Sequence, residues 1–386
     1  REGTTVCGMQ FEVNRADFHD TRAVTISTTS TPTETSPNEL QLGQIRLTVE
    51  RFALTTNNIT YAVAGDMLDY WGFFPADDNT VEPGADGKRW GRIPAMGLGS
   101  VAESAHPDIA VGGRYFGFYP MATDVVIDAT PYGNAFRDVG AHRAEHAATY
   151  TAFRDVTADV MFRPEQADEY LLLWGVFMTS FLVDDYLADN NFLDATQTLV
   201  TSASSKTSIC LAQCLAQRDD HRCIGSTSER NRVFVENLGL YDEVFTYDEV
   251  DQLDPTVTST LVDMAGNASV RSAVHTHFND ALKVSLTVGA THWQESGGGG
   301  TLPGPTPEFF FAPGQSAKRA GDWGQSELDA RIALSFHRLS DTTDQWLTVE
   351  HRTGPDGVES VYRSLLDGDA EPETGYVVTM HENPPS

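Results

Sequence analysis

From Thr196 onward, short apolar runs alternate with segments of helical pattern, and this alternation restricts the fold more than any other feature of the chain. The run "TQTLVTSA" is typical of a buried strand, and the following "SKTSICLAQCLAQ" is typical of a helix. The same order returns in "HRCIGST" and "SERNRVFVENLG". Three further apolar runs follow at 242–247, 259–266 and 283–290. Strand and helix alternating at this pitch predict an α/β fold with a doubly wound parallel sheet.

The turn between the first strand and its helix is "SASSKTS", residues 202–208. A turn that binds pyrophosphate needs backbone N–H groups aimed at the ligand and small residues that let it approach the helix N-terminus. Glycine usually meets this need, whereas here small hydroxyl residues take its place. Ser204, Ser205 and Thr207 could bond phosphate oxygens and Lys206 could add a point charge. The alternative is a serine-capped helix that follows a strand and binds nothing.

The second strand ends in "GSTSER". An NAD site would place Asp or Glu there to hold the ribose hydroxyls. Ser226, Thr227 and Arg230 instead offer hydroxyls and a cation, which suit a 2′-phosphate. These residues therefore favour NADP(H) as cofactor. The alternative makes Ser226 an ordinary helix cap and Arg230 a solvated charge.

The first part of the chain has a different residue pattern. Between Gln10 and Pro131, short runs alternate apolar and polar residues between Gly, Pro and Asn clusters, which predicts an antiparallel, barrel-like domain. Residues 132–168 are polar and mixed and suggest a surface connection. The tail from Trp346 returns to a strand–helix–strand pattern and is expected to rejoin the first domain. We predict a β-rich domain from 1–168 and 320–386, and a nucleotide-binding domain from 169–319.

Charge excludes several partner classes. Acidic residues number 55 against 26 basic ones, a formal charge of −29, which opposes binding to nucleic acid or an anionic membrane. A small-molecule substrate is therefore expected. A salt-adapted source and a GC-rich source explain the acidity and the scarcity of lysine equally well.

Neither the cysteine spacing nor the hydropathy indicates a metal site or a membrane-spanning segment. Cys7, Cys210, Cys214 and Cys223 include no CxxC pair, which argues against a zinc or disulfide scaffold. The longest apolar run, 169–187, is interrupted by Thr179 and Ser180 and carries acids, so we expect it not to span a membrane. No export signal is visible, and the cytoplasm is the expected location.

Several stretches resemble the medium-chain dehydrogenase/reductase superfamily in its zinc-free, quinone-oxidoreductase-like branch. The segment "IRLTVERFALTTNNITYAVAGD" is similar to the one that lines that family's substrate cleft, and "MTSFLVDDYL" resembles the helix that enters its cofactor domain. "LVDMAGN" and "VSLTVGATHW" resemble the fourth and fifth strands, whose ends face the cofactor. The closest likeness is to an uncharacterised branch of the superfamily. The resemblance implies a GroES-like β-rich domain, a Rossmann-type domain and an NADP(H) site in the cleft between them.

The departures from that family are informative. Its catalytic zinc site uses an early Cys and a Gly-His-Glu, but the corresponding text here is "GLGSVAES", and the lobe of four close cysteines is absent. A zinc alcohol dehydrogenase is therefore excluded, and we expect no metal ligands. The usual Gly-rich turn has become "SASSKTS".

The resemblance also implies site residues. Asn58 and Tyr61 would lie beside the nicotinamide and substrate, Thr179 near the nicotinamide, and Tyr61 could donate a proton to a developing oxyanion. Alternatively Tyr61 only lines the cleft and Asn58 serves a turn. The strand ends that would face the cofactor add four candidates: Tyr247, Gly266, Gly289 and Ala290.

His292 and the segment "EFFFAP" complete the candidates. His292 follows a strand at a carboxyl end, where doubly wound folds bind ligands, so it is a possible proton donor, or else a loop histidine in solvent. The resemblance implies that 308–313 forms an edge strand that pairs across a homodimer. The alternative is a buried strand in a monomer.

One motif competes with this interpretation. "HRAEH", residues 142–146, matches the H-x-x-E-H of one class of zinc peptidases, and on a helix both histidines would share a face. The segment lies in polar text without a clear third ligand, and a solvated helix explains it better.

The sequence thus predicts a zinc-independent NADP(H)-dependent oxidoreductase that reduces an activated carbonyl, enone or quinone. Two other hypotheses stay open. The fold could have been repurposed as a lyase or as a non-catalytic nucleotide- or ligand-binding module, or the chain could be a structural dimer without ligand.

Overall fold

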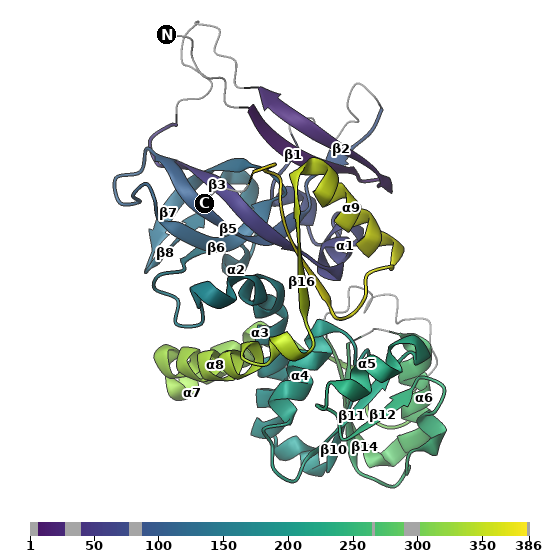
Figure 1. Ribbon diagram of the computed structural model, residues 1–386. Coiled ribbons are helices and arrows are strands. Elements are labelled where there is room, and N and C mark those ends of the chain that lie inside the picture. The colour runs from purple at the N-terminus through teal and green to yellow at the C-terminus, as the bar shows by residue number, and fades with distance from the viewer. Residues whose placement is uncertain (1–6, 28–39, 77–86, 265–266, 289–301, 384–386) are drawn as a thin grey trace, which may run out of the picture. The chain divides into compact units, whose positions relative to one another are not determined.

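The computed structural model describes residues 7–27, 40–76, 87–264, 267–288 and 302–383. Two compact units make up the chain. Unit 1 contains residues 1–172 and 348–386, and unit 2 contains residues 173–347. Figure 1 labels their helices and strands.

Unit 2 is built on a six-stranded sheet in which every pairing is parallel. Its spatial order is β12-β11-β10-β13-β14-β15, so the first strand in the chain lies inside the sheet and the succession reverses beside it. This is the strand order 3-2-1-4-5-6 of dinucleotide-binding folds. The predicted doubly wound sheet is thus confirmed. The strands are β10 (Gln197–Val200), β11 (Arg222–Thr227), β12 (Glu243–Thr246), β13 (Ser259–Asp263), β14 (Leu282–Thr287) and β15 (Glu308–Phe309).

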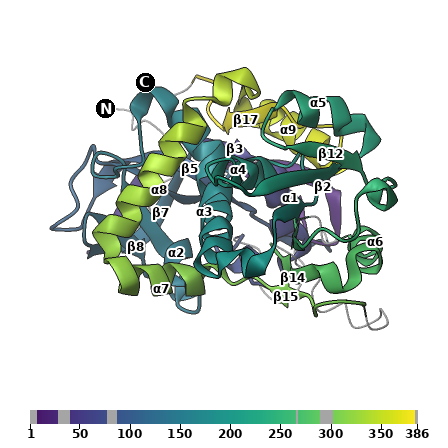
Figure 2. The ribbon, with the colours of Figure 1, turned by 90° about the horizontal axis from the view of Figure 1, so that it is seen from below.

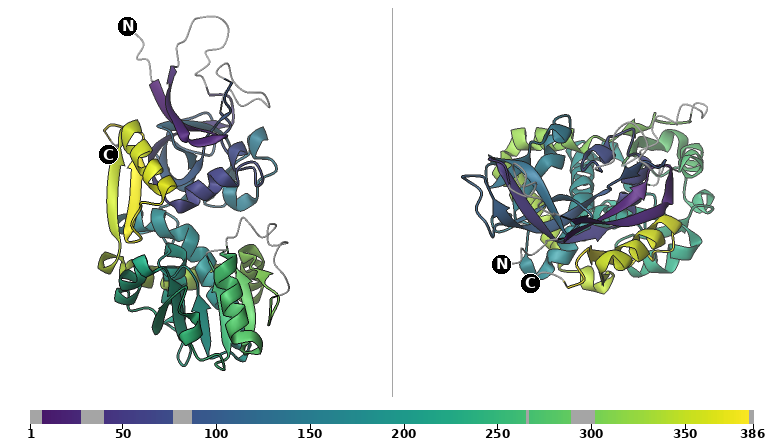
Figure 3. Two further views of the ribbon diagram at one scale, coloured as in Figure 1. Left: turned by 90° about the vertical axis from the view of Figure 1, so that its right-hand side faces the viewer. Right: turned by 90° about the horizontal axis from the view of Figure 1, so that it is seen from above.

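Neighbouring residues on each strand of this sheet face opposite helical layers. Val200 and Val262 pack with α3 (Ala167–Asp189) and α4 (Lys206–Leu215). Leu199 and Leu261 instead pack with α6 (Ala268–Phe278). Figure 3 shows helices on both sides of the sheet. Because both faces are covered, the strands are continuous apolar runs, which is why they were recognisable in the sequence.

Three more helices complete unit 2: α5 (Arg232–Asn237), α7 (Ala312–Trp323) and α8 (Gln325–Ser340). Between α7 and α8 the chain turns at Gly324, whose φ of 84° suits glycine, and Figure 2 shows the two helices meeting at an angle. The expected domain boundary at 319/320 falls inside α7, whereas the structure passes back to unit 1 after Leu347. The physical reason is that α8 is held by the core of unit 2: the rings of Phe336 and Phe177 lie 5.2 Å apart.

Unit 1 is built on an eight-stranded sheet in the order β16-β17-β3-β5-β6-β9-β8-β7. An additional pairing of β3 with β7 closes six of these strands into a ring, as the predicted barrel-like domain requires. A second sheet, β2-β1-β4, joins the first through a bridge between Gln10 and Ala122. The strands are β1 (Cys7–Asn14), β2 (Asp17–Ser27), β3 (Gln44–Leu54), β4 (Trp90–Gly91), β5 (Pro94–Ser104), β6 (Arg114–Pro120), β7 (Asp124–Tyr132), β8 (Ala135–Asp138), β9 (Ala152–Asp155), β16 (Thr348–Thr353) and β17 (Thr374–Thr379).

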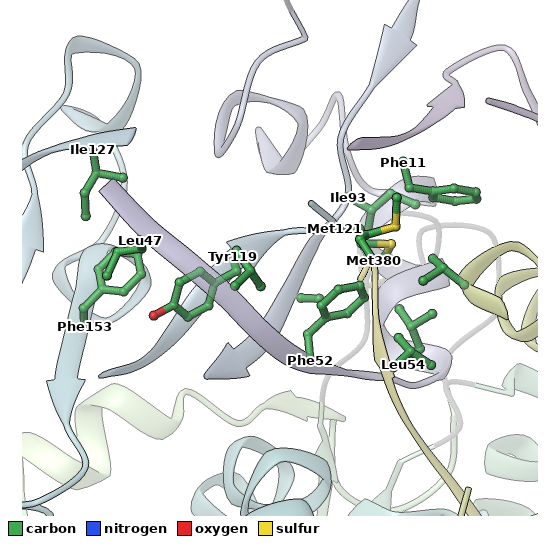
Figure 4. Packing of buried hydrophobic residues seen from close by; sticks show 14 of the residues in the cluster. Phe11, Leu47, Phe52, Leu54, Ile93, Tyr119, Met121, Ile127, Phe153 and Met380 are labelled. Atoms are coloured by element: carbon green, nitrogen blue, oxygen red, sulfur yellow. The ribbon is translucent and has the colours of Figure 1, made fainter. Parts of the chain in front are cut away.

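The interior of unit 1 is filled by one large apolar cluster. Leu47 and Phe52 come from β3, Tyr119 from β6 and Phe153 from β9, and each is almost inaccessible to solvent. Figure 4 shows these side chains converging. The alternation of apolar and polar residues along β3 places every second side chain in this core over most of the strand.

Residues 132–168 are not the surface connection that their polarity suggested. They contain β8 and β9, which pair with β7 and β6 and complete the ring. Phe136 and Phe153 stack inside it with centroids 5.0 Å apart. Each of the two strands is only four residues long, too short to show a period among polar neighbours.

The C-terminal tail rejoins unit 1, as expected. β17 pairs antiparallel with β3, and β16 lies parallel to β17 at the edge of the sheet. The connecting helix α9 (Gly354–Asp367) packs Val358 and Tyr362 against the core. Two short helices, α1 (Thr56–Val63) and α2 (Ala148–Thr151), complete the unit.

One described helical stretch, Pro164–Asp189, is long and apolar enough to cross a membrane by length and composition. Of the most apolar 18 residues of this stretch, 61% are buried inside the structure. A mostly buried core helix has the same length and composition.

Candidate functional site

The turn after β10 has the backbone form that a pyrophosphate site requires. Ser202 adopts a left-handed conformation with φ of 48°. The N–H of Ala203 donates to Ser226 O (2.9 Å), which ties the turn to the neighbouring strand. Ser205 caps α4, its side chain accepting from the N–H of Ser208 at 3.2 Å. The turn therefore directs the N-terminus of a ten-residue helix to the carboxyl edge of the sheet.

The serine hydroxyls of this turn are engaged within the protein. Ser205 Oγ bonds Ser208 Oγ (2.9 Å), and Ser208 Oγ donates to Thr201 O (2.8 Å). Ser204 Oγ accepts from Asn231 Nδ2 at 2.9 Å. Ser204 and Ser205 thus have structural contacts within the turn, and their contact with phosphate stays a prediction. Lys206 lies at the first position of α4.

A tyrosine that the sequence analysis missed supports the turn from below. Tyr241 donates its hydroxyl to Ala203 O (2.9 Å). Its ring fits against Gly225, where a Cβ would lie 2.9 Å from Tyr241 Cδ1 and 3.1 Å from Ala203 Cβ. The turn itself contains no glycine, but Gly225 in the neighbouring strand β11 leaves room for the Tyr241 ring beside Ala203. "IGST" carried the signal, because a glycine inside a strand marks close packing.

At the carboxyl end of β11, the three predicted cofactor residues separate into two groups. Ser226 and Thr227 are 1% and 0% exposed, and neither hydroxyl has a hydrogen-bond partner among the described residues. Arg230, in the short helix Glu229–Asn231, is exposed. Of the three, Arg230 is the group that can reach a ligand phosphate from the surface. Tyr247, just beyond β12, is half-buried and donates its N–H to Thr227 O (3.1 Å).

Beneath the switch in strand order lies a buried ionic network that the sequence analysis also missed. Asp263 ends β13 with no exposed surface. Its Oδ2 accepts from Arg271 Nη1 of α6 at 3.0 Å, and its Oδ1 accepts from Thr201 Oγ1 at 2.9 Å. Thr201 Oγ1 in turn accepts from the N–H of Met264 at 2.9 Å. The ends of the two central strands, where doubly wound folds bind ligands, are locked together by this network.

The helix that carries Thr179 is bonded to this turn. Ser180, the next residue of α3, is fully buried, and its hydroxyl donates a hydrogen bond to Thr207 O (2.7 Å). Thr179 itself is half-buried. Unit 2 therefore brings Thr179 near the first turn of α4.

Four predicted residues, Gly266, Gly289, Ala290 and His292, lie outside the described residues.

In unit 1, Tyr61 belongs to a group of aromatic rings that we call the aromatic cluster: Tyr61, Tyr70, Phe73, Phe118 and Tyr150. The Tyr61 and Tyr70 rings lie 4.5 Å apart. Burial raises the pKa of both phenols, with a further contribution from Tyr150. Both hydroxyls therefore remain protonated donors at neutral pH.

Asn58 has a structural task. It is 3% exposed, its Oδ1 accepts from the N–H of Thr55 (2.8 Å), and its Nδ2 donates to Pro94 O (2.9 Å). The side chain thereby caps α1 and ties it to β5. With both ends of the amide bonded in the protein, Asn58 positions the helix of Tyr61 and has no free end for a ligand.

The histidines of "HRAEH" do not share a helical face, because the helix there is a single turn, Ala141–Arg143. His142 Nε2 lies 3.8 Å from Asp138 Oδ2, and His146 Nε2 lies 3.2 Å from Asp69 Oδ2. Among the described residues, no group of three or more His, Cys, Asp or Glu side chains could hold a metal ion. The peptidase interpretation therefore has no geometric support in the part of the chain that the structure describes.

Solved structures with the same fold are known. CurA from Vibrio vulnificus, solved in complex with NADPH, is 13% identical, with 97% of this chain and 100% of that chain covered and a TM-score of 0.57. A mitochondrial 2-enoyl thioester reductase heterodimer from Candida tropicalis is 12% identical, with 97% and 100% covered and a TM-score of 0.55. A quinone oxidoreductase from Coxiella burnetii is 12% identical, with 97% and 99% covered and a TM-score of 0.51. The fold is therefore that of the medium-chain dehydrogenases/reductases.

Within that fold class, the chain belongs to the family described as "Protein of unknown function (DUF2855)", whose model matches residues 52–371. The matched segment includes the turn at 202–208, the aromatic cluster and the network around Asp263. No curated protein matches the sequence.

Proposed function

We propose that this protein is a zinc-independent, NADP(H)-dependent reductase of a small conjugated carbonyl compound, an enone or a quinone. The observation that carries the proposal is the turn at 202–208, which directs the N-terminus of α4 to the carboxyl edge of a 3-2-1-4-5-6 sheet. The NADPH complex of CurA, which has this fold, supports the cofactor assignment.

The residues of unit 2 fit a dinucleotide phosphate. Backbone N–H groups in the first turn of α4 and the Lys206 side chain would hold the pyrophosphate, and Arg230 would meet the 2′-phosphate. The carboxylate that an NAD site needs does not stand at the end of β11, which ends in Ser226 and Thr227; the exposed Glu229 comes only in the short helix that follows. Thr179 would lie near the nicotinamide. NADPH, when bound, supplies a hydride.

In unit 1, the Tyr61 hydroxyl would donate a proton to the developing enolate or alkoxide. Its raised pKa keeps this proton in place until negative charge develops on the substrate. Asn58 would fix the helix that carries it. A bound water is the alternative proton donor.

A second candidate function, a repurposed binding module or lyase, is favoured by one observation. The hydroxyl of Ser205 already donates to Ser208 Oγ in the protein, so one donor fewer remains for phosphate. This module would bind a nucleotide or another ligand without hydride transfer.

Thermal melting with nucleotides tests the proposal. NADPH at about a hundredfold excess over its Kd is expected to stabilise the protein by about 2.7 kcal/mol, a rise in Tm of roughly 5–10 °C. Lys206→Ala should weaken NADPH binding by at least about tenfold, and Arg230→Ala should remove the preference for NADPH over NADH.

The controls use the opposite edge of the same sheet. Lys283 and Arg222 lie near the amino ends of β14 and β11, so Lys283→Ala and Arg222→Ala should leave nucleotide binding unchanged. Added EDTA should also leave it unchanged. If neither nucleotide moves the transition, the reductase hypothesis fails; binding without oxidation of NADPH by any quinone or enone would favour the second candidate.

The sheet edge in unit 2 supports a homodimer through 308–313. β15 is the edge strand, with Phe309 and Phe311 51% and 63% exposed while Phe310 is buried against the sheet. Exposed apolar side chains on an unpaired edge favour association with a second copy. We expect sedimentation equilibrium to show a dimer, and Phe309→Lys with Phe311→Lys to show a monomer with an unchanged Tm for unit 2. A monomeric wild type would contradict this assembly.

A further inference from the structure

Three tyrosines that are distant in the sequence lie together in unit 1. Tyr61 lies in the last turn of α1, Tyr70 starts the short helix Tyr70–Gly72, and Tyr150 lies in α2. The Tyr70 ring lies 4.5 Å from that of Tyr61 and 6.4 Å from that of Tyr150. Besides burial, the neighbouring Tyr150 phenol contributes to the raised pKa of both Tyr61 and Tyr70.

Apolar rings enclose these hydroxyls. The Phe118 ring lies 6.2 Å from Tyr61 and 5.6 Å from Tyr150, and the Phe73 ring lies 5.3 Å from both Tyr70 and Tyr150. Phe73 and Phe118 are buried, whereas the three tyrosines are half-buried. In such surroundings a hydrogen bond to a charged acceptor is stronger than in water.

Buried charges keep the cluster in place. Arg143, 2% exposed, donates to the carbonyls of Phe73 (3.1 Å) and Tyr150, and its guanidinium lies 4.5 Å from the Phe73 ring centroid. The His146 ring lies 4.5 Å from the same phenylalanine, and its Nε2 donates to the carbonyl of Asp69 (3.1 Å), just before Tyr70. The phenols are thus held before any ligand arrives, as a preorganised donor site requires.

We propose that the hydroxyls of Tyr61, Tyr70 and Tyr150 together form a binding site for the oxyanion of a planar conjugated ligand, such as an enolate or a phenolate. Phenylalanine would pack equally well at all three positions, so apolar packing alone does not require three hydroxyls. The hydroxyls supply donors, and the flat ring faces match a conjugated ligand. With a formal charge of −29, the protein repels anions in general, so an oxyanion needs a built donor site.

The catalytic consequence rests on the proposed function, whereas ligand binding does not. During reduction, an electron pair moves onto the carbonyl oxygen of the substrate, and the three phenols stabilise that charge. The O–H bond of Tyr61 then breaks as the proton bonds to the product. The resulting tyrosinate regains a proton through Tyr70 and Tyr150 from water, so the site returns to its starting state.

Binding of 4-nitrophenolate to the full chain tests the site, because this flat oxyanion reports its surroundings by its visible absorbance. We expect saturable binding at mildly alkaline pH, weakened by about tenfold or more in Tyr150→Phe and in Tyr70→Phe. Each variant keeps its ring and loses only its hydroxyl. Tyr132→Phe is the matched control, since Tyr132 is 56% exposed on β7 outside the cluster, and it should bind as the wild type does.

Tyrosinate absorbance in an alkaline titration gives a second readout that needs no ligand. Removing the Tyr150 hydroxyl should shift the titration of Tyr61 and Tyr70, whereas Tyr132→Phe should leave the titration of these two phenols unchanged. No saturable binding by the wild type, or equal affinity in Tyr150→Phe, overturns the site.

The two hypotheses fail separately. If NADPH stabilises the protein but 4-nitrophenolate does not bind, the donor-site hypothesis fails and the reductase hypothesis stands. Tyrosine-dependent 4-nitrophenolate binding without NADPH stabilisation supports the donor site and removes the reductase.

Discussion

Replacing Asp263 by asparagine is expected to lower the free energy of unfolding by about 3–5 kcal/mol, because the variant leaves a buried guanidinium without its counter-ion. Asp263 has no exposed surface and lies 3.0 Å from Arg271 Nη1. Asparagine has nearly the same shape, so the loss measures charge and hydrogen bonding, with little change in packing. The bond from Thr201 to Asp263 is at risk in the same variant.

Urea unfolding of the full chain measures this loss. Asp322→Asn is the control: Asp322 lies 2.7 Å from Lys318 on the surface of α7, where an ion pair contributes little to stability. Asp263→Leu combined with Arg271→Met should recover most of the stability, since removing both charges leaves neither one unpaired. A loss in Asp263→Asn no larger than in the control would show that the buried pair contributes little.

The same experiments test the cofactor site. Asp263 and Thr201 join the ends of the two central strands, so their loss should also weaken NADPH binding in the proposed reductase. A destabilised variant that binds NADPH normally would confine the network to a structural role.

Replacing Arg143 by methionine is expected to cost about 3–5 kcal/mol in unit 1. Arg143 is 2% exposed, its Nε lies 3.7 Å from the Asp138 carboxylate, and it donates to the carbonyls of Phe73 and Tyr150. Burial lowers the pKa of the Arg143 guanidinium to about 10, so it stays charged at neutral pH. Methionine fills the volume but leaves the carboxylate without its counter-charge and two carbonyls without their donor.

The loss should depend on pH in a definite direction. Burial already raises the pKa of Asp138, and Arg143 opposes that rise. Without Arg143 the folded-state pKa rises further above the unfolded value, so folding takes up protons and stability falls as pH increases through that range. The deficit of Arg143→Met should therefore shrink toward acid pH, and Asp138→Asn added to it should remove this pH dependence.

Arg352→Met is the control for this substitution. Arg352 forms an ion pair of 2.6 Å with Glu350 on the exposed edge strand of the same unit, and its loss should cost less than about 1 kcal/mol. Equal losses in the two variants, or a deficit at Arg143 that does not vary with pH, would contradict this account.

Sequence reasoning reached the parallel sheet and located the turn at 202–208 because the central strands β10 and β13 are covered on both faces. Such strands appear in the sequence as continuous apolar runs. The small polar residues between the apolar run of β10 and the helical pattern of α4 mark the turn. β8 and β9 were missed for the opposite reason. They are four residues each, half-exposed and set among polar residues, so no period is long enough to detect.

The division of the chain near residue 320 shows a different limit. The pattern of α8 predicts an amphipathic helix but carries no information about which core its apolar face contacts. Phe336 meets Phe177 of α3, and only the packing of the folded chain assigns α8 to unit 2.

By itself, the sequence determined the alternation of strands and helices, the turn at 202–208 and the hydroxyl residues Ser226 and Thr227 at the end of the second strand, since all of these are local patterns. Tertiary structure alone decided which polar groups are used. It buried Ser226 and Thr227, bonded Asn58 at both ends, paired Asp263 with Arg271, and brought Tyr61, Tyr70 and Tyr150 together. The physical reason is that hydrogen bonds, ion pairs and ring contacts depend on distances in space between distant segments, which no local period encodes.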